Sequence, residues 1–356
     1  MTSLFEPVTV GKFALKNRLA MAPMSRNRAL PSGDATELMA EYYSQRAAAG
    51  LIITEGIQPS QVGQGFINSP GLHTPEHARS WRVVTDAVHA EGGTIVAQLM
   101  HSGRIGHPSL YPSAHQSVAP SAIAAGGQCF TPDGMQDYLE PHELTADEIE
   151  ATIQDFVASA RYAVDAGFDA VQLHAGNGFL LHQFMAENTN TRTDGYGGSL
   201  GNRIRFAVEV TEAVAAAIGN DRTSVRISPA NPYNDIVEGD TQALYQALVP
   251  ALPELAFLEV CEIVTRPMTK MIRELWQGSL IVNPHATPDS FPATPKTAQE
   301  VLDENLADVV SVGALWLANP DLLDRIKAGG PFNEVDQSTF YGGDQHGYTD
   351  YSVLGR

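Results

Sequence analysis

The stretch Asp169-Ala-Val-Gln-Leu-His174-Ala-Gly-Asn177-Gly-Phe179 decides the fold of this chain. Its first half is a short apolar run, typical of a buried parallel strand. His174 stands where that strand ends, and Asn177 follows three residues later. A His and an Asn at this separation can direct two hydrogen-bond donors at one acceptor oxygen, such as that of a carbonyl, nitro or phenolate group. The alternative is that both residues cap the helix that follows.

Similar short apolar runs recur along the chain, and helix-length segments separate most of them. We expect strands at Arg18–Ala22, Leu51–Thr54, Thr94–Leu99, Ala170–His174, Ser224–Ile227, Phe257–Val260, Leu280–Val282 and Val309–Val312. Helical patterns include Pro75–Glu91, Thr145–Ala166, Asn202–Ile218, Thr241–Leu252 and Thr297–Glu304, the second opened by a Thr145-x-x-Glu148 capping box. Eight alternations predict an α/β fold, the (β/α)8 or TIM barrel, formed by residues 1–356 as a single domain.

Two segments depart from a minimal barrel. Phe5–Leu15 resembles a hairpin that would close the amino-terminal face of the barrel. Residues 102–143, after the third strand, form a long Gly-, Pro- and Ser-rich insertion that we expect to cap the catalytic face. The alternative fold, a doubly wound open sheet, would need a glycine-rich turn after its first strand, and Pro23-Met-Ser-Arg follows instead.

Composition excludes several classes of partner. The net charge of −19 argues against nucleic acid and acidic membrane surfaces. No apolar run reaches membrane-spanning length, and the first residues lack a signal pattern, so we expect a cytoplasmic protein with no membrane partner. The two cysteines, Cys129 and Cys261, make no metal-ligand cluster, so we expect reduced thiols and no metal.

Chemistry in such a barrel is found at the carboxyl ends of the strands. Those positions include a hydroxyl (Ser25), an amide (Gln98) and a permanent cation (Arg226) beside the His/Asn pair. This set suits a flavin ring, because an amide matches the donors and acceptors of its pyrimidine edge and an arginine can stabilise the negative charge of the reduced ring. The competing interpretation for Arg226 is an ion pair inside the barrel, for example with Glu259.

At this point the chain resembles the old yellow enzyme family of FMN-dependent ene-reductases. The resemblance covers nearly the whole chain and includes Lys16-Asn-Arg-Leu-Ala-Met-Ala-Pro-Met-Ser25, Ala97-Gln98-Leu-Met100-His-Ser-Gly-Arg104, Asn190-Thr-Arg-Thr-Asp-Gly-Tyr-Gly-Gly-Ser199, Val225-Arg226-Ile-Ser-Pro and Ala318-Asn-Pro-Asp-Leu. It implies FMN as cofactor, NADPH or NADH as hydride source, and an activated C=C bond in a small-molecule substrate.

The resemblance also implies roles for individual residues. His174 and Asn177 would hold the electron-withdrawing oxygen of the substrate. The flavin would be lined by Pro23, Met24, Ser25, Gly56, Gln98 and Arg226, with Gly313 and Ala314 beside its phosphate, and the substrate pocket by Phe66, Met100 and Tyr341.

Phe179 departs from the family pattern. The family usually has a tyrosine at this position, which protonates the α-carbon of the substrate. Phenylalanine has no proton to give, so an ene-reductase would use water or another side chain, and loss of a general acid costs on the order of 10²–10⁴ in rate. We therefore expect either slow alkene reduction or acceptors that need no such proton, such as quinones and nitro compounds. Phe179→Tyr is expected to raise alkene reduction.

The phosphate end of the flavin site is the second departure. The family's seventh strand usually ends in a glycine-containing turn and its eighth in Gly-Arg, whereas this chain has Pro284 and Ala314. His285 or Lys296 could supply a replacement cation. The alternatives are a related cofactor such as a deazaflavin, or loss of the flavin.

Two further functions stay open at this level. Without a proton donor, a reduced flavin could return the hydride after bond rotation, which would make the protein an alkene isomerase. A barrel that has lost redox chemistry could bind a small aromatic ligand or a partner protein. We expect a monomer or a small homo-oligomer.

Overall fold

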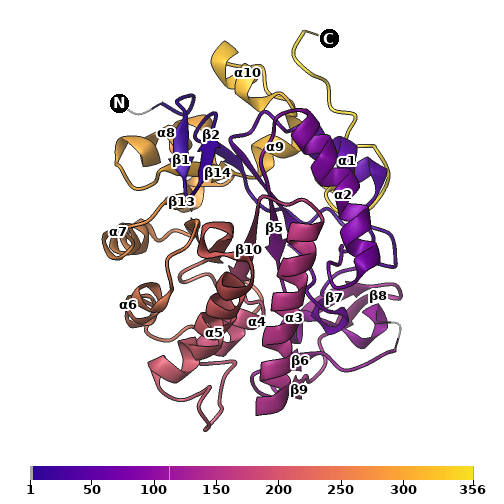
Figure 1. The fold of residues 1–356 in the computed structure, drawn as a ribbon, viewed down its shortest axis with the longest axis vertical. Helices are drawn as coiled ribbons and strands as arrows, with labels where there is room; N and C mark the ends of the chain where they lie inside the picture. The colour runs from indigo at the N-terminus through magenta and orange to yellow at the C-terminus, as the bar shows by residue number, and fades with distance from the viewer. Residues whose placement is uncertain (1–2, 112, 356) are drawn as a thin grey trace.

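A computed structural model describes residues 3–111 and 113–355 and shows a closed parallel barrel. Each barrel strand pairs with the next along the chain, and the last pairs with the first (Figure 1). The strands are β3 (Leu19–Met21), β4 (Leu51–Ile57), β5 (Ile95–Leu99), β10 (Ala170–Ala175), β11 (Thr223–Ile227), β12 (Phe257–Cys261), β13 (Leu280–Asn283) and β14 (Val309–Val312). The predicted barrel is confirmed, and the open-sheet alternative is wrong.

Ten α-helices occur in the described residues, and most cover the outside of the barrel (Figure 1). They are α1 (Glu37–Ser44), α2 (Pro75–Ala90), α3 (Ala146–Asp165), α4 (Leu180–Met185), α5 (Leu200–Ile218), α6 (Thr241–Ala251), α7 (Arg266–Leu275), α8 (Pro295–Asp303), α9 (Ala314–Ala318) and α10 (Leu322–Ala328). The predicted capping box opens α3, with Glu148 bonded back to Thr145. The predicted helix ends lie within two residues of the observed ones; α8, for instance, begins at Pro295 because Thr294 caps it.

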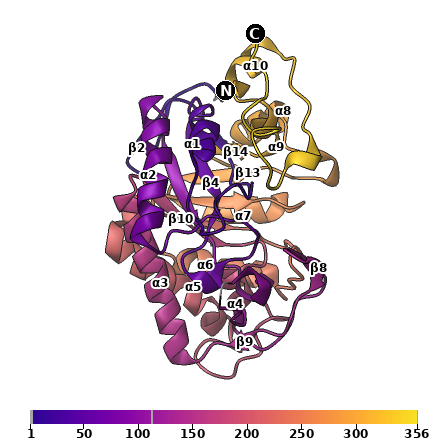
Figure 2. The ribbon, with the colours of Figure 1, turned by 90° about the vertical axis from the view of Figure 1, so that its right-hand side faces the viewer.

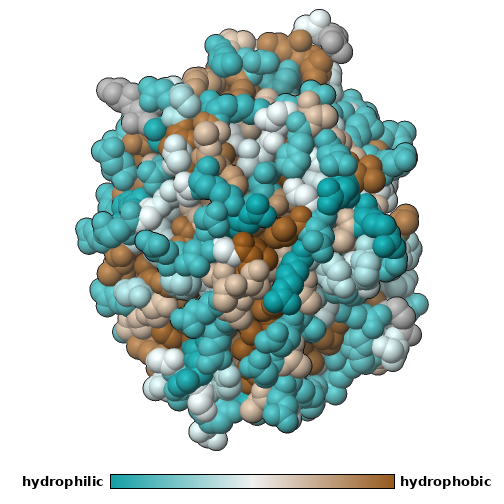
Figure 3. Space-filling model, in the orientation of Figure 1, coloured by the Kyte–Doolittle hydropathy of each residue, from teal (hydrophilic) through white to brown (hydrophobic). Residues whose placement is uncertain are grey.

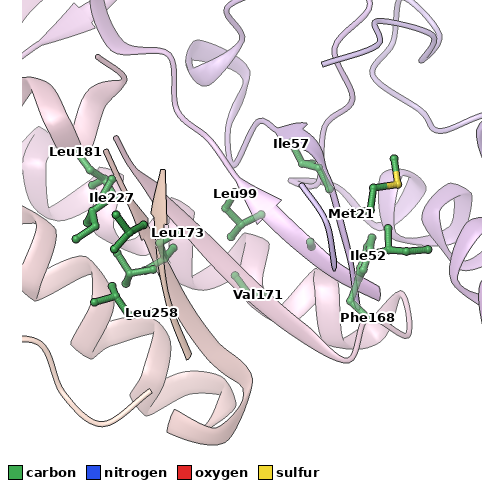
Figure 4. Packing of buried hydrophobic residues seen from close by; sticks show 14 of the residues in the cluster. Met21, Ile52, Ile57, Leu99, Phe168, Val171, Leu173, Leu181, Ile227 and Leu258 are labelled. Atoms are coloured by element: carbon green, nitrogen blue, oxygen red, sulfur yellow. The ribbon is translucent and has the colours of Figure 1, made fainter. Parts of the chain in front are cut away.

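Alternation along the strands separates two apolar layers. One set of strand residues packs outward against the helices, and Figure 4 shows part of it, with Leu173 and Ile227 gathered near Leu181 of α4. The alternate residues fill the barrel interior. The part of the interior near the amino-terminal ends of the strands is apolar and includes Leu51, Phe257 and residues on five other barrel strands.

The predicted hairpin closes the amino-terminal end of the barrel. β1 (Val8–Val10) and β2 (Phe13–Leu15) pair antiparallel. Val10 and Leu15 are buried in the same cluster as these apolar interior residues. Because this end is filled by apolar side chains, a ligand can enter the interior at the carboxyl ends of the strands alone.

The insertion after β5 carries its own small strands and lies over the opposite end. β6 (Val118–Ala119) pairs with β9 (His142–Glu143), and β7 (Gln128–Thr131) forms a hairpin with β8 (Gly134–Asp137). In Figure 2, β8 and the C-terminal segment stand on the same side of the barrel, below and above its middle. Arg104 fixes the insertion, because its buried guanidinium donates to the Asp235 carbonyl at 2.6 Å in the loop after β11. The predicted cap is thus confirmed.

The face drawn in Figure 3 is mostly hydrophilic, with apolar side chains gathered near its centre. Among the described residues, no helix combines the length and the apolar character needed to cross a membrane.

Candidate active site

A cavity of about 600 Å³ lies between the carboxyl ends of the strands and the insertion. Its size is typical of a pocket for a cofactor or small molecule. Except for Gly313 and Ala314, every site residue predicted from the sequence lines it: Pro23, Met24, Ser25, Gly56, Phe66, Gln98, Met100, His174, Asn177, Phe179, Arg226 and Tyr341. The structure therefore brings together side chains that come from five strands and the C-terminal segment.

A row of hydrogen-bonded, buried polar side chains includes two residues, Gln98 and Arg226, that line the cavity. Gln98 of β5 and Gln172 of β10 are paired in register, and Gln98 Nε2 donates a hydrogen bond to Gln172 Oε1 at 2.9 Å. Gln172 Nε2 in turn donates to Glu259 Oε2 at 2.7 Å, and Glu259 pairs with Arg226. We call Gln98, Gln172, Glu259 and Arg226 the interior polar row. Their mutual hydrogen bonds fix each side chain in one orientation.

Arg226 is the one charged side chain among the described residues that line the cavity. Burial is the largest single effect and opposes its charge, but Glu259 and Cys261 together outweigh burial, so the pKa of the guanidinium lies above its ordinary value. Its Nη2 also donates to Asn283 Oδ1 at 3.1 Å, while its buried Nε has no hydrogen-bond partner. The ion pair of Arg226 with Glu259 inside the barrel is therefore confirmed. Arg226 also presents a fixed positive charge to the cavity, and its contact with a flavin stays a prediction.

His174 and Asn177 meet at the same wall, as the sequence predicts. His174 is adjacent to Arg226 in register, and it is buried. Burial, followed by the charge of Arg226, holds the pKa of His174 well below its ordinary value, so the ring is neutral at neutral pH. A neutral imidazole still donates one hydrogen bond. The buried Nδ1 of His174 has no partner in the described residues, which is a cost that a bound polar group would offset.

Asn177 is held by neighbours in the loop after β11. Its backbone lies in the left-handed region, with φ of 53°, which asparagine tolerates well. The backbone N–H of Asn177 donates to Ser228 Oγ at 2.7 Å, and Asn231 Nδ2 donates to Asn177 Oδ1 at 2.7 Å. Because its amide oxygen is occupied, the amide nitrogen of Asn177 is left as the donor to the cavity. His182 fixes the following residue, Gly178, through a 3.1 Å hydrogen bond and has a structural role.

The loop after β3 is held by a carboxylate. Glu55 Oε2 accepts hydrogen bonds from the backbone N–H groups of Arg26 and Asn27, both at 3.1 Å, and Oε1 accepts from the Tyr43 hydroxyl at 3.3 Å. Burial raises the pKa of the Glu55 carboxyl. These bonds position the adjacent Ser25 at the cavity, where the described residues give its hydroxyl no hydrogen bond.

Apolar side chains make the remaining wall. Phe179 is buried and contacts the His174 ring, with centroids 5.1 Å apart, and meets Phe66 edge-on at 6.3 Å. Met100 belongs to the same cluster. Gly56 allows Met100 to approach closely, because a Cβ at this position would lie 2.6 Å from the Met100 sulfur and would displace that side chain. The position of Phe179 thus offers a ligand an aromatic surface and no proton.

The ends of β13 and β14 contribute much less. In (β/α)8 barrels a phosphate often binds at the loops after the seventh and eighth strands. The His285 ring, however, stacks on Phe291 at 4.0 Å, its Nδ1 lies 3.2 Å from the Glu262 carbonyl oxygen, and burial lowers its pKa to about 4. Lys296 lies on α8 with its side chain 86% exposed, 3.8 Å from Glu300. Neither side chain lines the cavity, so the suggestion that one of them replaces the missing cation stays a prediction without support from this geometry.

Gly313 and Ala314 follow β14 at the start of α9 but do not line the cavity. The Met24 side chain covers Gly313, with its sulfur 3.1 Å from where a Cβ would be. Their contact with a cofactor phosphate stays a prediction. The described residues therefore fit a flavin ring, through the interior polar row and Ser25, and provide no arginine at the end of β14 for its phosphate.

Several cavity residues were not found from the sequence. The insertion was expected to cover the site, but its contacting residues depend on how the β7–β8 hairpin is placed. Gln172 could have been found, because it stands two residues before His174 and so shares its face of the strand. The additional lining residues are Asn27, Ile67, Gln128, Cys129, Phe130, Met135, Tyr138 and Tyr233.

Comparison with known proteins agrees with this geometry. Residues 3–333 match the model of the NADH:flavin oxidoreductase / NADH oxidase family. A probable flavin mononucleotide-dependent alkene reductase of Leishmania infantum is 40% identical, over 99% of this chain and 97% of that protein. The structure of morphinone reductase in complex with tetrahydroNAD is 39% identical, with a TM-score of 0.94 over 99% of this chain and 98% of that one. The old yellow enzyme homologue from Zymomonas mobilis is also 39% identical, with a TM-score of 0.92 over 99% and 100% of the two chains. The chain is thus a member of the NADH:flavin oxidoreductase / NADH oxidase family, to which the old yellow enzyme homologues belong.

Proposed function

We propose that this protein is an FMN-dependent ene-reductase, which uses NADPH or NADH to reduce an activated C=C bond of an enone or enal. The observation that carries the proposal is the single cavity in which a fixed cation, an amide and a neutral His/Asn pair converge. Family membership gives the flavin, and the relatives' names give the reaction: one is an alkene reductase, and another is a reductase bound to a nicotinamide analogue.

The residues divide into two groups by position. Gln98 and Arg226, fixed by the interior polar row, would hold the polar edge of the flavin ring, and Ser25 would lie near its reactive edge. His174 and Asn177 would each donate a hydrogen bond to the oxygen of the substrate, which draws electrons from the conjugated alkene. When bound, FMN accepts a hydride from the nicotinamide and supplies it to the substrate.

The insertion and the aromatic wall complete the site. They cover the cavity on the side away from the barrel, which lowers the local dielectric and strengthens the hydrogen bonds to the substrate oxygen. Quinones and nitro compounds carry equivalent acceptor oxygens and belong to the same proposal. We place the protein in the cytoplasm, as a monomer or small homo-oligomer, on the basis of its composition.

Product analysis tests the proposal. The purified protein is given NADPH or NADH and cyclohex-2-enone without oxygen, and the product is identified by mass spectrometry. We expect cyclohexanone and one oxidised nicotinamide per product. A rearranged alkene with no net nicotinamide oxidation would favour the isomerase, and a protein that retains no flavin after FMN is added and desalted would favour the non-redox barrel. Either result would contradict the proposal.

A further inference from the structure

Reduction of a C=C bond needs a proton as well as a hydride. The hydride forms a bond to the β-carbon, the π electrons move to the α-carbon, and a new C–H bond forms there as a donor O–H bond breaks. Phe179, on the wall beside His174, has no such bond to break. If the protein reduces alkenes as proposed above, the proton comes from another group that reaches the cavity.

Three tyrosines line the cavity, and they differ in depth. Tyr233 is 56% exposed and Tyr341 is 68% exposed, so both lie at the opening. Tyr138 is partly buried and packs against the apolar cluster that contains Met100 and Phe179. Tyr138 is therefore the phenol inside the cavity, on the wall where Phe179 lies.

The Tyr138 hydroxyl is free to act on a ligand. No described residue forms a hydrogen bond with it, although its neighbours in the insertion are well bonded. Burial, with smaller effects from Cys129 and Tyr233, raises the pKa of Tyr138 to about 12, so the phenol carries its proton at neutral pH.

The insertion holds Tyr138 across the cavity from the barrel. Tyr138 directly follows β8, and the β7–β8 hairpin lines the cavity together with it. Two residues of the insertion bind Asp235. Arg104 donates a hydrogen bond to its carbonyl oxygen, and the Gly126 N–H donates to its Oδ2 at 3.0 Å. A flavin ring on Gln98 and Arg226 would lie on the barrel side, so a substrate between the two would meet the hydride on one face and Tyr138 on the other.

We propose that Tyr138 is the proton donor of the oxidative half-reaction. As the hydride reaches the β-carbon, the Tyr138 Oη–H bond breaks and its proton forms the new bond at the α-carbon on the opposite face. The resulting phenolate takes a proton from water that enters at the opening of the cavity. The gain expected from Phe179→Tyr is accordingly largest when Tyr138 is absent.

The face of protonation tests this assignment. Holoenzyme is reduced without oxygen in D2O and mixed with 2-methylcyclohex-2-enone, whose C2 becomes a stereocentre on protonation. For the unaltered protein we expect deuterium at C2 from one face. Tyr138→Phe is expected to form product about 10²-fold more slowly or worse, with deuterium from both faces. The visible spectrum of the bound flavin shows that the variant is folded and loaded.

Two further variants separate a chemical role from a structural one. Tyr233→Phe removes a phenol at the opening and is expected to keep one-face labelling. The double variant Tyr138→Phe/Phe179→Tyr is expected to recover rate and one-face labelling, because a phenol again lies in the same cluster. Unchanged rate and labelling in Tyr138→Phe would overturn the assignment and leave the ene-reductase function intact. Absence of any saturated product from the unaltered protein would overturn both.

Discussion

The two sides of the barrel mouth differ in the polar groups that they present to a ligand. On β5, β10, β11 and β12, the interior polar row connects Gln98 to Arg226 through buried hydrogen bonds. On β13 and β14, His285 is neutral and stacked on Phe291, and Ala314 stands where a cation is expected by resemblance. One side is built to hold a polar ring, whereas the other has no arginine at the end of its last strand.

This difference shows where binding free energy is concentrated. A charge fixed by buried neighbours interacts more strongly with a ligand than a mobile surface charge, because it needs no reorganisation. We therefore infer that the β5–β12 side supplies most of the flavin affinity, and that the phosphate contributes less than it would beside an arginine.

Arg226→Ala is expected to have the largest effect. It leaves the Glu259 carboxylate buried without its partner, so the free energy of unfolding should fall by about 3–5 kcal/mol, and the flavin should be lost on desalting. Urea unfolding and the visible spectrum measure the two effects. Lys12→Ala is the control, because its ion pair with Asp221 is exposed and worth about 0–1 kcal/mol. A similar loss in both variants would contradict the account.

Asn177→Ala should slow substrate reduction while the flavin stays bound. Removing one preorganised donor to a developing negative oxygen costs about 10²–10³ in rate. Stopped-flow reoxidation of the reduced protein by an enone measures it. Asn305→Ala is a matched control, because Asn305 also has a positive φ, 54°, but is exposed on the surface. Both variants place an alanine in the left-handed region, and only Asn177→Ala removes a hydrogen-bond donor from the cavity. Equal slowing would assign the effect to strain.

Ala314→Arg should strengthen binding at the weaker side. If the flavin phosphate lies at the end of β14, an added charge-assisted hydrogen bond of about 1.5–3 kcal/mol raises the preference for FMN over riboflavin by roughly 10- to 100-fold. Fluorescence quenching of each flavin gives the two dissociation constants. Ala314→Gln controls for side-chain length. A preference that does not change would show that the phosphate binds elsewhere.

His174 should make the protein less stable in acid. Because its folded pKa lies well below that of an unfolded histidine, about 6.5, the unfolded chain binds more protons as the pH falls below that value. The free energy of unfolding should therefore decrease by about 1.4 kcal/mol per pH unit from this group, and His174→Gln should make the decrease shallower. Urea unfolding at pH 7 and 5.5 measures it. His346→Gln removes a surface histidine whose pKa Asp350 raises, so it should not make the decrease shallower.

The fold was largely predictable because short apolar runs and helical patterns are local features of the sequence. Alternation in Ala170–Ala175 gives both the buried strand and the face that carries His174. The end of β4 was not predicted from local patterns. The strand continues to Ile57, three residues beyond the prediction, and its register with β5 shifts between Ile53 and Gly56. Such irregularities depend on the neighbouring strand, which a single run of residues does not show.

From the residues alone, the site was predictable where a side chain sits at a strand end, whereas Phe66 and Tyr341, which lie in loops, were predicted from the family resemblance. Gln98, His174 and Arg226 meet because the carboxyl ends of parallel strands share one rim. Tyr138 reaches the same cavity from an insertion whose path is fixed by Arg104 and Asp235, far apart in sequence. That side chain could be located only once the insertion was seen packed on the barrel.

The most direct test of the contrast between the two sides is a titration of the flavin-free protein with FMN and with riboflavin. Both have the same ring, and only FMN has a phosphate. If the β5–β12 side supplies most of the affinity, both bind, and the preference for FMN stays within about tenfold, or about 1.4 kcal/mol. Tight binding of FMN with no measurable binding of riboflavin would contradict this account and place the main anchor at the phosphate.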